Sequence, residues 1–277
     1  MGAKLRTFHP NGTLQMDTER VTMGLLKSGY LEYAYRAYKL KQPSLNSGSW
    51  VPWTQYDDVH SCSFEAVAPV IFLHGPGARV YFNRTGNQWT VYFAGASTQT
   101  RFYVFDLMRD VGTGPALITR DPTGRVTFNS RQWPMNVVAN VIPAGPPPPI
   151  GNPTPPGGRF YPAYVGGTFE ILAAQSQYFE WIVSRWHYQM TPGRLYAASL
   201  QWSRGALMAG GEYTYYRAWN VIEGAYGNAG SITFWFTTLP GSRIGEEHLT
   251  ERFYNVPTRL SAAQVIDVTD LPFPYQA

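Results

Sequence analysis

Short runs of aromatic and β-branched residues, separated by clusters of Gly, Pro, Asn and Ser, recur through most of this 277-residue chain. They include "ARVYFNRTGNQWTVYFAG" and "TRFYVFDLM" in the first half, and "GTFEILAA", "RLYAASLQWS" and "SITFWFTTLP" in the second. Such runs are typical of β-strands, and the clusters between them are typical of turns. With 19 Tyr, 15 Phe and 9 Trp, the composition favours the same pleated structure. The sequence therefore predicts an all-β protein.

One run is ambiguous. "YFEWIVSRWHYQM" (178–190) places Phe179, Ile182, Val183 and Trp186 at helical spacing. Its aromatic and β-branched content favours a strand, and we expect one.

A proline-rich segment marks the clearest boundary in the chain. Residues 143–158, "PAGPPPPIGNPTPPGG", hold eight Pro and four Gly. Proline cannot donate a backbone hydrogen bond, so we expect an extended linker here rather than a helix or a central strand. The expected organisation is a hairpin-rich docking domain (1–142), the linker (143–158), an antiparallel sandwich or jelly-roll-like domain (159–242) and an extended arm (243–277).

Two short segments repeat one pattern. "HPNGTLQMDTER" (9–20) and "RDPTGRVTFNSR" (120–131) both contain Pro-x-Gly-x-(Leu/Val)-x-(Met/Phe)-(Asp/Asn)-(Thr/Ser). Pro10 and Pro122 set φ for a turn, and Gly12 and Gly124 supply the positive φ that a tight turn needs. We expect each segment to form a β-hairpin. Duplication is favoured, and independent use of a good turn is the alternative.

The motifs of common enzyme classes are missing from the sequence. There is no Gly-Lys-Ser/Thr phosphate loop and no Gly-x-Ser-x-Gly nucleophile turn, and the five His lack metal-ligand spacing. Cys62 is expected to be a small buried residue. Two carboxylate pairs, Glu170 with Glu180 and Glu212 with Glu223, would suit glycoside hydrolysis only if the fold joined them, and solvated or ion-paired roles are favoured. We predict no enzyme activity, no catalytic residue, no metal and no cofactor.

The charge and hydropathy of the sequence argue against two classes of partner, nucleic acids and membranes. The net charge is +4, the Arg residues are scattered, and no basic face or 18-residue apolar run is visible. We therefore expect neither nucleic-acid binding nor membrane insertion. The start of the chain lacks the apolar core of a signal peptide, which predicts synthesis in the cytoplasm.

Aromatic residues of the second half are the candidate ligand or interface residues. Exposed rings stack on the C–H faces of sugars, whereas buried rings fill a core or a protein interface. Both readings stay open for Trp186, Trp202, Tyr213, Tyr215 and Trp219.

The repeated segments, with their flanks "KLRTFHPNGTLQMDTERVTMG" and "PALITRDPTGRVTFNSRQWPMNVV", resemble a module of minor tail proteins of tailed bacteriophages. In the second copy the match consists of Phe128, Asn129, Ser130, Arg131 and Pro134. In the first copy Met16, Asp17, Thr18 and Arg20 match more loosely, and no Pro follows. The resemblance covers less than a fifth of the chain.

This resemblance implies a structural component of the tail tip, baseplate or fibre, located in the virion, with other tail proteins as partners and no catalytic residues. It also implies a homo-oligomer, for which we expect a trimer. The alternatives are a module that binds a host glycan or receptor through its C-terminal aromatics, a head decoration or collar protein and, least favoured, a glycan depolymerase.

The last residues carry a further expectation. The tail has little room for a core of its own, and it ends in an extended segment around Pro272 and Pro274. Its apolar residues include Leu260, Val265, Ile266, Val268, Leu271, Phe273 and Tyr275. A segment of this kind must be ordered by another surface. We expect it to lie on a neighbouring subunit.

Overall fold

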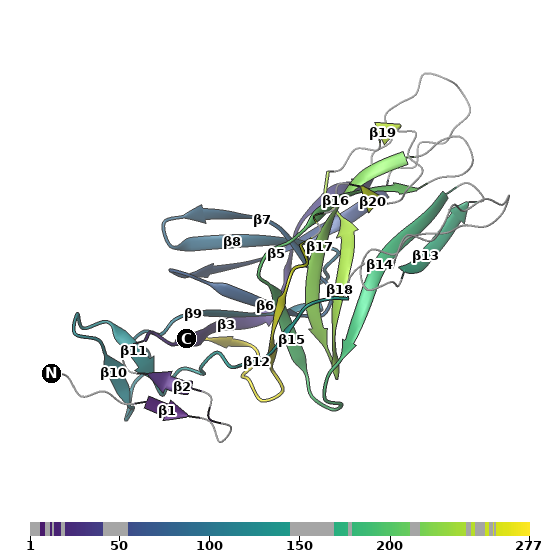
Figure 1. The fold of residues 1–277 in the computed structure, drawn as a ribbon. Coiled ribbons are helices and arrows are strands. Elements are labelled where there is room, and N and C mark those ends of the chain that lie inside the picture. Colours follow the sequence, from purple (N-terminus) through teal and green to yellow (C-terminus); the bar gives the residue numbers. More distant parts are fainter. Residues whose placement is uncertain are drawn as a thin grey trace.

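The computed structural model describes residues 6–8, 12, 14–17, 20–40, 55–144, 169–176, 179–210, 217–241, 245–246, 253–254, 257 and 259–277. All regular structure in these residues is β, which confirms the predicted class (Figure 1). The ambiguous run at 178–190 is a strand. Within the described ranges there is no helix long and apolar enough to cross a membrane.

The described strands form one large sheet and three smaller ones. The large sheet consists of β3 (Met23–Tyr30), β6 (Val70–His74), β9 (Arg101–Leu107), β12 (Val137–Val141), β13 (Phe169–Ser176), β14 (Phe179–Gln189), β15 (Tyr196–Leu200), β16 (Gly205–Gly210), β17 (Arg217–Asn228), β18 (Ser231–Thr238), β19 (Gly245–Glu246), β20 (Phe253–Tyr254), β21 (Ala263–Asp267) and β22 (Tyr275–Gln276). A second sheet has the order β4 (Glu32–Leu40), β5 (Gln55–Glu65), β8 (Gln88–Ala94) and β7 (Ala78–Thr85). Two hairpins complete the set: β1 (Arg6–Phe8) with β2 (Leu14–Asp17), and β10 (Ile118–Arg120) with β11 (Val126–Asn129).

The large sheet joins strands from both sides of the proline-rich segment. Its main path runs β12-β21-β15-β6-β17-β18-β14-β13, so that β6 lies between two strands of the second half. β6 also pairs with β9 through a regular antiparallel ladder, and β9 pairs antiparallel with β3 with one register shift between Leu25 and Lys27. In Figure 1, the strands of the first half extend away from the long strands β17 and β18.

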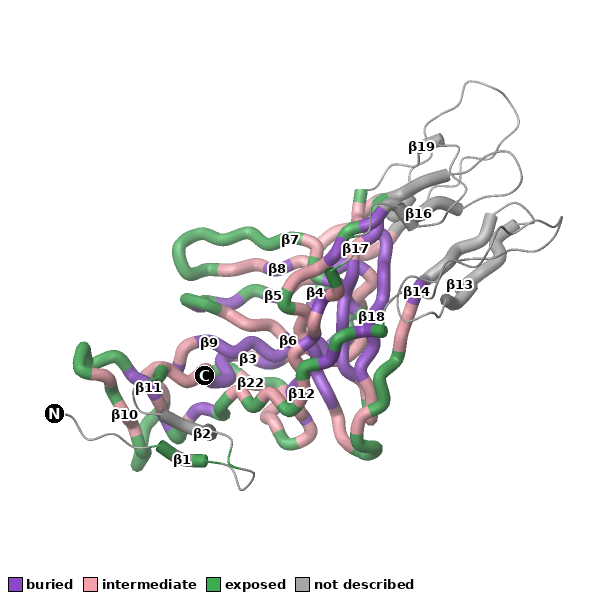
Figure 2. The backbone as a smooth tube through the Cα atoms, in the orientation of Figure 1, coloured by how far each residue is buried: buried purple, intermediate pink, exposed green. Residues whose placement is uncertain are grey.

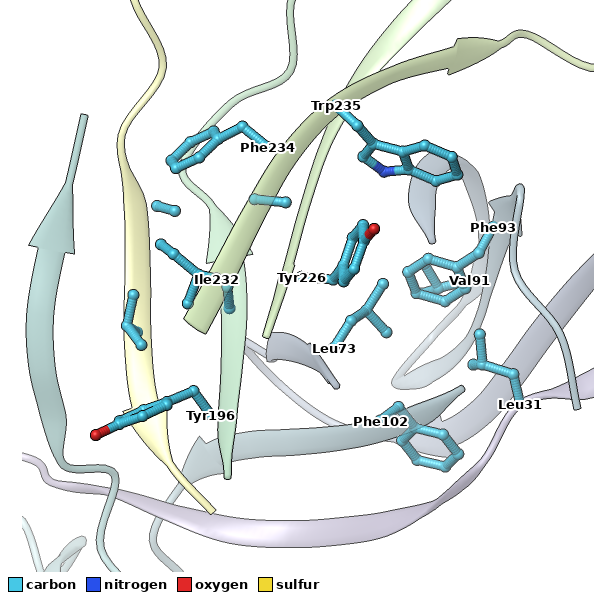
Figure 3. Close-up of a cluster of buried hydrophobic side chains, with 14 of the residues drawn as sticks. Leu31, Leu73, Val91, Phe93, Phe102, Tyr196, Tyr226, Ile232, Phe234 and Trp235 are labelled. Atoms are coloured by element: carbon cyan, nitrogen blue, oxygen red, sulfur yellow. The ribbon is translucent and has the colours of Figure 1, made fainter. Parts of the chain in front are cut away.

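Both halves also contribute to one hydrophobic core. Figure 3 shows side chains of this core, and Figure 2 shows the buried backbone that surrounds it. The labelled residues before the segment are Leu31, Leu73, Val91, Phe93 and Phe102, and those after it are Tyr196, Tyr226, Ile232, Phe234 and Trp235.

The expected division into two domains with separate cores is therefore wrong. The composition of 143–158 disfavours a strand within that segment, but it carries no information on whether the strands before and after it pair with each other. The linker itself, from residue 145 onward, lies outside the described residues.

The described end of the chain does not form the extended arm that we expected from the sequence. β21 lies between β12 and β15 and pairs with both, and β22 pairs with β3. Ala263, Val265, Ile266 and Val268 are buried. Residues 263–277 thus fold onto their own chain, where β21 and β22 pair with strands of the large sheet. This segment does need a surface to offset the conformational entropy that it loses on ordering, but that surface belongs to the same chain.

Deletion of residues 263–277 should therefore abolish cooperative folding. It would expose the edges of β12 and β15 and remove four buried apolar side chains, each worth roughly 1–3 kcal/mol. We expect circular dichroism to show no cooperative thermal transition for the truncated chain. A truncated chain that melts cooperatively near the temperature of the full chain would contradict this placement of β21.

Candidate functional site

The two copies of the repeat form hairpins with matching registers. In the first, Arg6, Thr7 and Phe8 lie opposite Asp17, Met16 and Leu14. In the second, Ile118, Thr119 and Arg120 lie opposite Asn129, Phe128 and Val126. Every pair of the first hairpin maps onto a pair of the second at the offset of 112 residues, and the register shifts at the corresponding step in both.

The turns also agree. Gly12 has φ +80° and Gly124 has φ +85°, so both turns need the positive φ that glycine adopts without steric cost. Shared residues, register, irregularity and turn conformation favour duplication over chance reuse of a turn.

The second turn is organised by Asp121. Its Oδ1 accepts hydrogen bonds from Thr123 N (2.9 Å), Thr123 Oγ1 (2.6 Å) and Arg125 N (3.0 Å). Its Oδ2 pairs with Arg125 Nε at 3.0 Å. The hydrogen bond from the Thr123 hydroxyl is the main cause that lowers the pKa of Asp121. In the first copy this position is His9, which lies outside the described residues, so only the second turn is shown to carry this network.

The strands that follow the two hairpins meet at corresponding residues. Met135 N donates to Met23 O (2.8 Å), and Leu25 N donates to Trp133 O (2.7 Å). Gly24 and Pro134 form an antiparallel bridge between these bonds. Met23 and Met135 are equivalent under the 112-residue offset. Two copies that face each other antiparallel at equivalent residues are the arrangement that a local two-fold axis would produce.

Buried polar contacts fix the second hairpin to the large sheet. Asn129 Nδ2 donates to Arg109 O (2.9 Å), and Arg109 N donates to Gln132 Oε1 (2.8 Å). Arg109 also pairs with the buried Asp106 at 2.9 Å, and Asp106 accepts from the backbone N–H groups of Val67 and Ala68. The hairpin is therefore held by satisfied buried groups and acts as part of the folded body.

Among the predicted aromatic residues, Trp186 and Trp202 have described side chains, and neither is exposed. Trp186 is half-buried, packs against the core and lies 5.7 Å from the ring of Phe234. Trp202 is half-buried, with the guanidinium of Arg259 5.7 Å from its ring centroid. Tyr213 and Tyr215 lie outside the described residues, and for Trp219 only the backbone, in β17, is described.

An aromatic cluster that the sequence analysis missed lies on the sheet of β4, β5, β8 and β7. The rings of Tyr81 and Tyr92 stack at 4.3 Å, and Tyr35 lies 6.1 Å from Tyr92. Tyr81 Oη donates to Tyr35 Oη at 3.0 Å. Beside them, the hydroxyl groups of Ser63 and Thr90 share a hydrogen bond of 2.9 Å.

The side of the sheet follows from the strand register. Val91 and Phe93 belong to the core, so the alternating Thr90 and Tyr92 face away from it. Tyr81, opposite Tyr92 on the edge strand β7, is 41% exposed. We call Tyr35, Tyr81 and Tyr92 the tyrosine cluster. The sequence predicts the hairpin of β7 and β8, which pairs Tyr81 with Tyr92. No local sequence signal places Tyr35 beside these two rings.

Of the four candidate catalytic carboxylates, Glu223 is the one whose side chain the structure describes. Glu223 is fully buried and accepts a two-pronged contact from Arg204, with Nε–Oε2 at 2.6 Å and Nη2–Oε1 at 2.5 Å. Burial raises the pKa of Glu223, and the guanidinium opposes this rise. The side chains of Glu170 and Glu180 are not described, and Glu212 lies outside the described residues.

The Cys and His side chains described next are buried or hydrogen-bonded within the fold. Cys62 is buried, as expected, and burial raises the pKa of its thiol. His74 Nδ1 donates to Tyr196 O at 2.7 Å, and burial lowers the pKa of its ring. His187 Nδ1 lies 2.9 Å from Thr233 Oγ1. Across the described ranges, no three His, Cys, Asp or Glu side chains lie together in a way that could hold a metal ion.

No family model, no curated protein and no solved structure matches this chain.

The buried pair of Arg204 and Glu223 gives a stability prediction. Glu223→Gln or Arg204→Met leaves the other charge buried without its counter-ion, which should cost about 3–5 kcal/mol. The double variant Arg204→Met/Glu223→Leu should cost less than either single change. Urea unfolding followed by tryptophan fluorescence measures all three.

A matched control is the exposed pair of Arg120 and Asp110, in which Nη2 and Oδ2 lie 2.7 Å apart. Asp110→Asn should change the free energy of unfolding by less than about 1 kcal/mol, because solvent screens this pair. Additive effects of the two buried substitutions would contradict the pairing.

Proposed function

We propose that this chain is a non-enzymatic structural protein of the virion of a tailed bacteriophage, acting at the distal end of the tail in assembly and host attachment. The observation that carries the proposal is the repeated hairpin module, whose sequence resembles a module of phage minor tail proteins. Its two copies share their register and their turn conformation.

The anchoring of the module supports a docking role. The second hairpin is tied to the large sheet by Asn129, Arg109 and Asp106, while its strand β10 is partly exposed and residues 122–125 of its turn are exposed. A rigid, anchored element that presents an exposed edge suits contact with a neighbouring protein, because little conformational entropy is lost on binding.

Non-enzymatic action is supported by the surroundings of Glu223. This carboxylate is sealed in the core by Arg204, so it has no access to a sugar substrate. A homo-oligomer, with a trimer preferred, stays part of the proposal through the resemblance alone, because the strands within residues 263–277 pair with strands of their own chain.

Purified particles of the phage that encodes the chain test the proposal. We expect immunogold labelling to place the protein at the distal tail, and deletion of its gene to give particles that fail to adsorb. Labelling of the head or collar would favour the decoration or collar alternative. Absence from purified particles, or release of sugar reducing ends from host polysaccharide by the pure protein, would contradict the proposal.

A second candidate function, binding of a host glycan, is favoured by the tyrosine cluster rather than by the C-terminal aromatics. Tyr81 lies on an edge strand with one ring face stacked on Tyr92, which leaves its other face for a sugar. Hydroxyl groups of Ser63 and Thr90 lie on the same side of the sheet. Aromatic faces next to hydroxyl groups are the chemistry that recognises carbohydrate.

A glycan array with the full chain tests this candidate. Tyr81→Ala should reduce binding about tenfold, the loss expected for removing one ring contact worth 0.5–1.5 kcal/mol together with its buried area. Phe82→Ala is the matched control. Phe82 is 52% exposed and follows Tyr81 on the same strand, so its side chain points to the opposite face of the sheet. Equal losses in both variants, or no binding by the unmodified chain, would exclude the tyrosine cluster.

A further inference from the structure

A small cavity lies where β7 and β8 approach the large sheet. Its volume is about 30 Å³, and it is not closed off from solvent. Buried Leu73, Gly77, Phe93, Ala198, Gly224 and Ala225 form its floor. Partly exposed Ile71, Arg79, Ser199, Leu200 and Ser203 form its rim.

Glycine lets the walls of this cavity pack closely. A Cβ on Gly224 would lie 2.7 Å from Ala78 Cβ and 2.8 Å from Trp235 Nε1, and a Cβ on Gly77 would lie 2.8 Å from Leu73 Cδ1. Contacts this short do not occur, so a side chain at either position would push the walls apart and change the shape of the cavity.

A buried donor borders the floor. Trp235 is only 5% exposed, and its indole N–H has no hydrogen-bond partner among the described residues. It lies beside Gly224, a floor residue, and Figure 3 shows its nitrogen on the ring edge that faces Tyr226 and, beyond it, Leu73. A buried N–H without an acceptor costs about 1–3 kcal/mol, so an acceptor in the cavity would recover that free energy.

The rim carries one uncompensated positive charge. Arg79 has no ion pair in the part of the chain that the structure describes, and no Asp or Glu lines the cavity. Arg204, next to Ser203 in the sequence, is neutralised by Glu223. The charged groups that line the cavity therefore amount to a single cation, and N–H and hydroxyl donors lie nearby.

We propose that this cavity binds the carboxylate head of a larger molecule. A carboxylate is a planar monoanion that accepts two parallel hydrogen bonds from a guanidinium, and it needs no acceptor on the protein. About 30 Å³ holds little more than such a head, so the rest of the ligand stays outside. The carboxylate can come from an acidic side chain of a partner protein or from an acidic sugar. This inference does not rest on the proposed place of the chain in a virion.

Nuclear magnetic resonance of the full ¹⁵N-labelled chain at low salt tests the site. Acetate should shift the indole N–H signal of Trp235 and the Nε–H signal of Arg79 with one saturating curve, and a Kd on the order of 1 mM is expected for so small a ligand. Acetamide, which has the same shape without the charge, should leave both signals in place. Capped glutamate and glucuronate then distinguish the two sources of the carboxylate. Tighter binding of capped glutamate would indicate a partner protein, and tighter binding of glucuronate would indicate an acidic sugar.

Variants separate binding from folding. Arg79→Gln should weaken acetate binding about tenfold or more, because a charge-assisted hydrogen bond is worth about 1.5–3 kcal/mol. Arg84→Gln is the matched control, because Arg84 lies on the same strand and packs over Trp89, and it should not affect binding. If Arg79→Gln fails to fold, Ser203→Val narrows the rim and should weaken binding instead.

The assignment is overturned if acetamide shifts the Trp235 signal as acetate does. It is equally overturned if the acetate shift does not saturate, or if it persists unchanged in a folded Arg79→Gln variant. Each of these results would mean that the cavity holds water alone.

Discussion

The fold depends on one close approach between backbones, where β17 passes β15. A Cβ on Gly227 would lie 1.8 Å from the carbonyl oxygen of Tyr196, so only glycine fits there. The same place receives β6 from the first half of the chain: Gly75 N donates to Gly227 O at 2.9 Å, and His74 Nδ1 donates to Tyr196 O at 2.7 Å. We call this meeting of β6, β15 and β17 the strand crossing.

Much of the architecture follows from the strand crossing. β6 pairs with β9, which pairs with β3, and β15 pairs with β21, which pairs with β12. The core between the large sheet and the sheet of β4, β5, β8 and β7 can then be filled from both halves, with Leu73 and Phe93 from one and Ile232 and Phe234 from the other. The cavity beside Gly224 lies in the same region, between β7 and β17.

The local features of this fold could be predicted from the sequence, and the distant pairings could not. The all-β class, the strand at 179–189 and the two hairpins are set by residues within a few positions of one another, such as Pro122 and Gly124 in a turn. The shared core depends on pairings such as Leu73 with Ala198, which join residues more than a hundred positions apart. No local signal reports these pairings, and the proline-rich segment between them favoured the opposite conclusion.

The same difference explains the candidate sites. Aromatic composition drew attention to Trp186 and Trp202, but both are half-buried by strands distant in sequence. The tyrosine cluster and the cavity beside Gly224 are built from three or more elements each, and the walls of the cavity pack closely only because residues 77 and 224 are glycine. A glycine in a strand indicates a close approach, but the sequence does not show what approaches it.

The central claim of this account is that residues on both sides of the proline-rich segment form one folding unit. Expression of residues 1–150 and 151–277 as separate chains, examined alone and after mixing by ¹H–¹⁵N correlation spectra, tests it directly. Each fragment alone should give the narrow amide dispersion of an unfolded chain, and the mixture should recover the dispersed spectrum of the intact protein. A well-dispersed spectrum from either fragment alone, unchanged by addition of the other, would contradict the shared core.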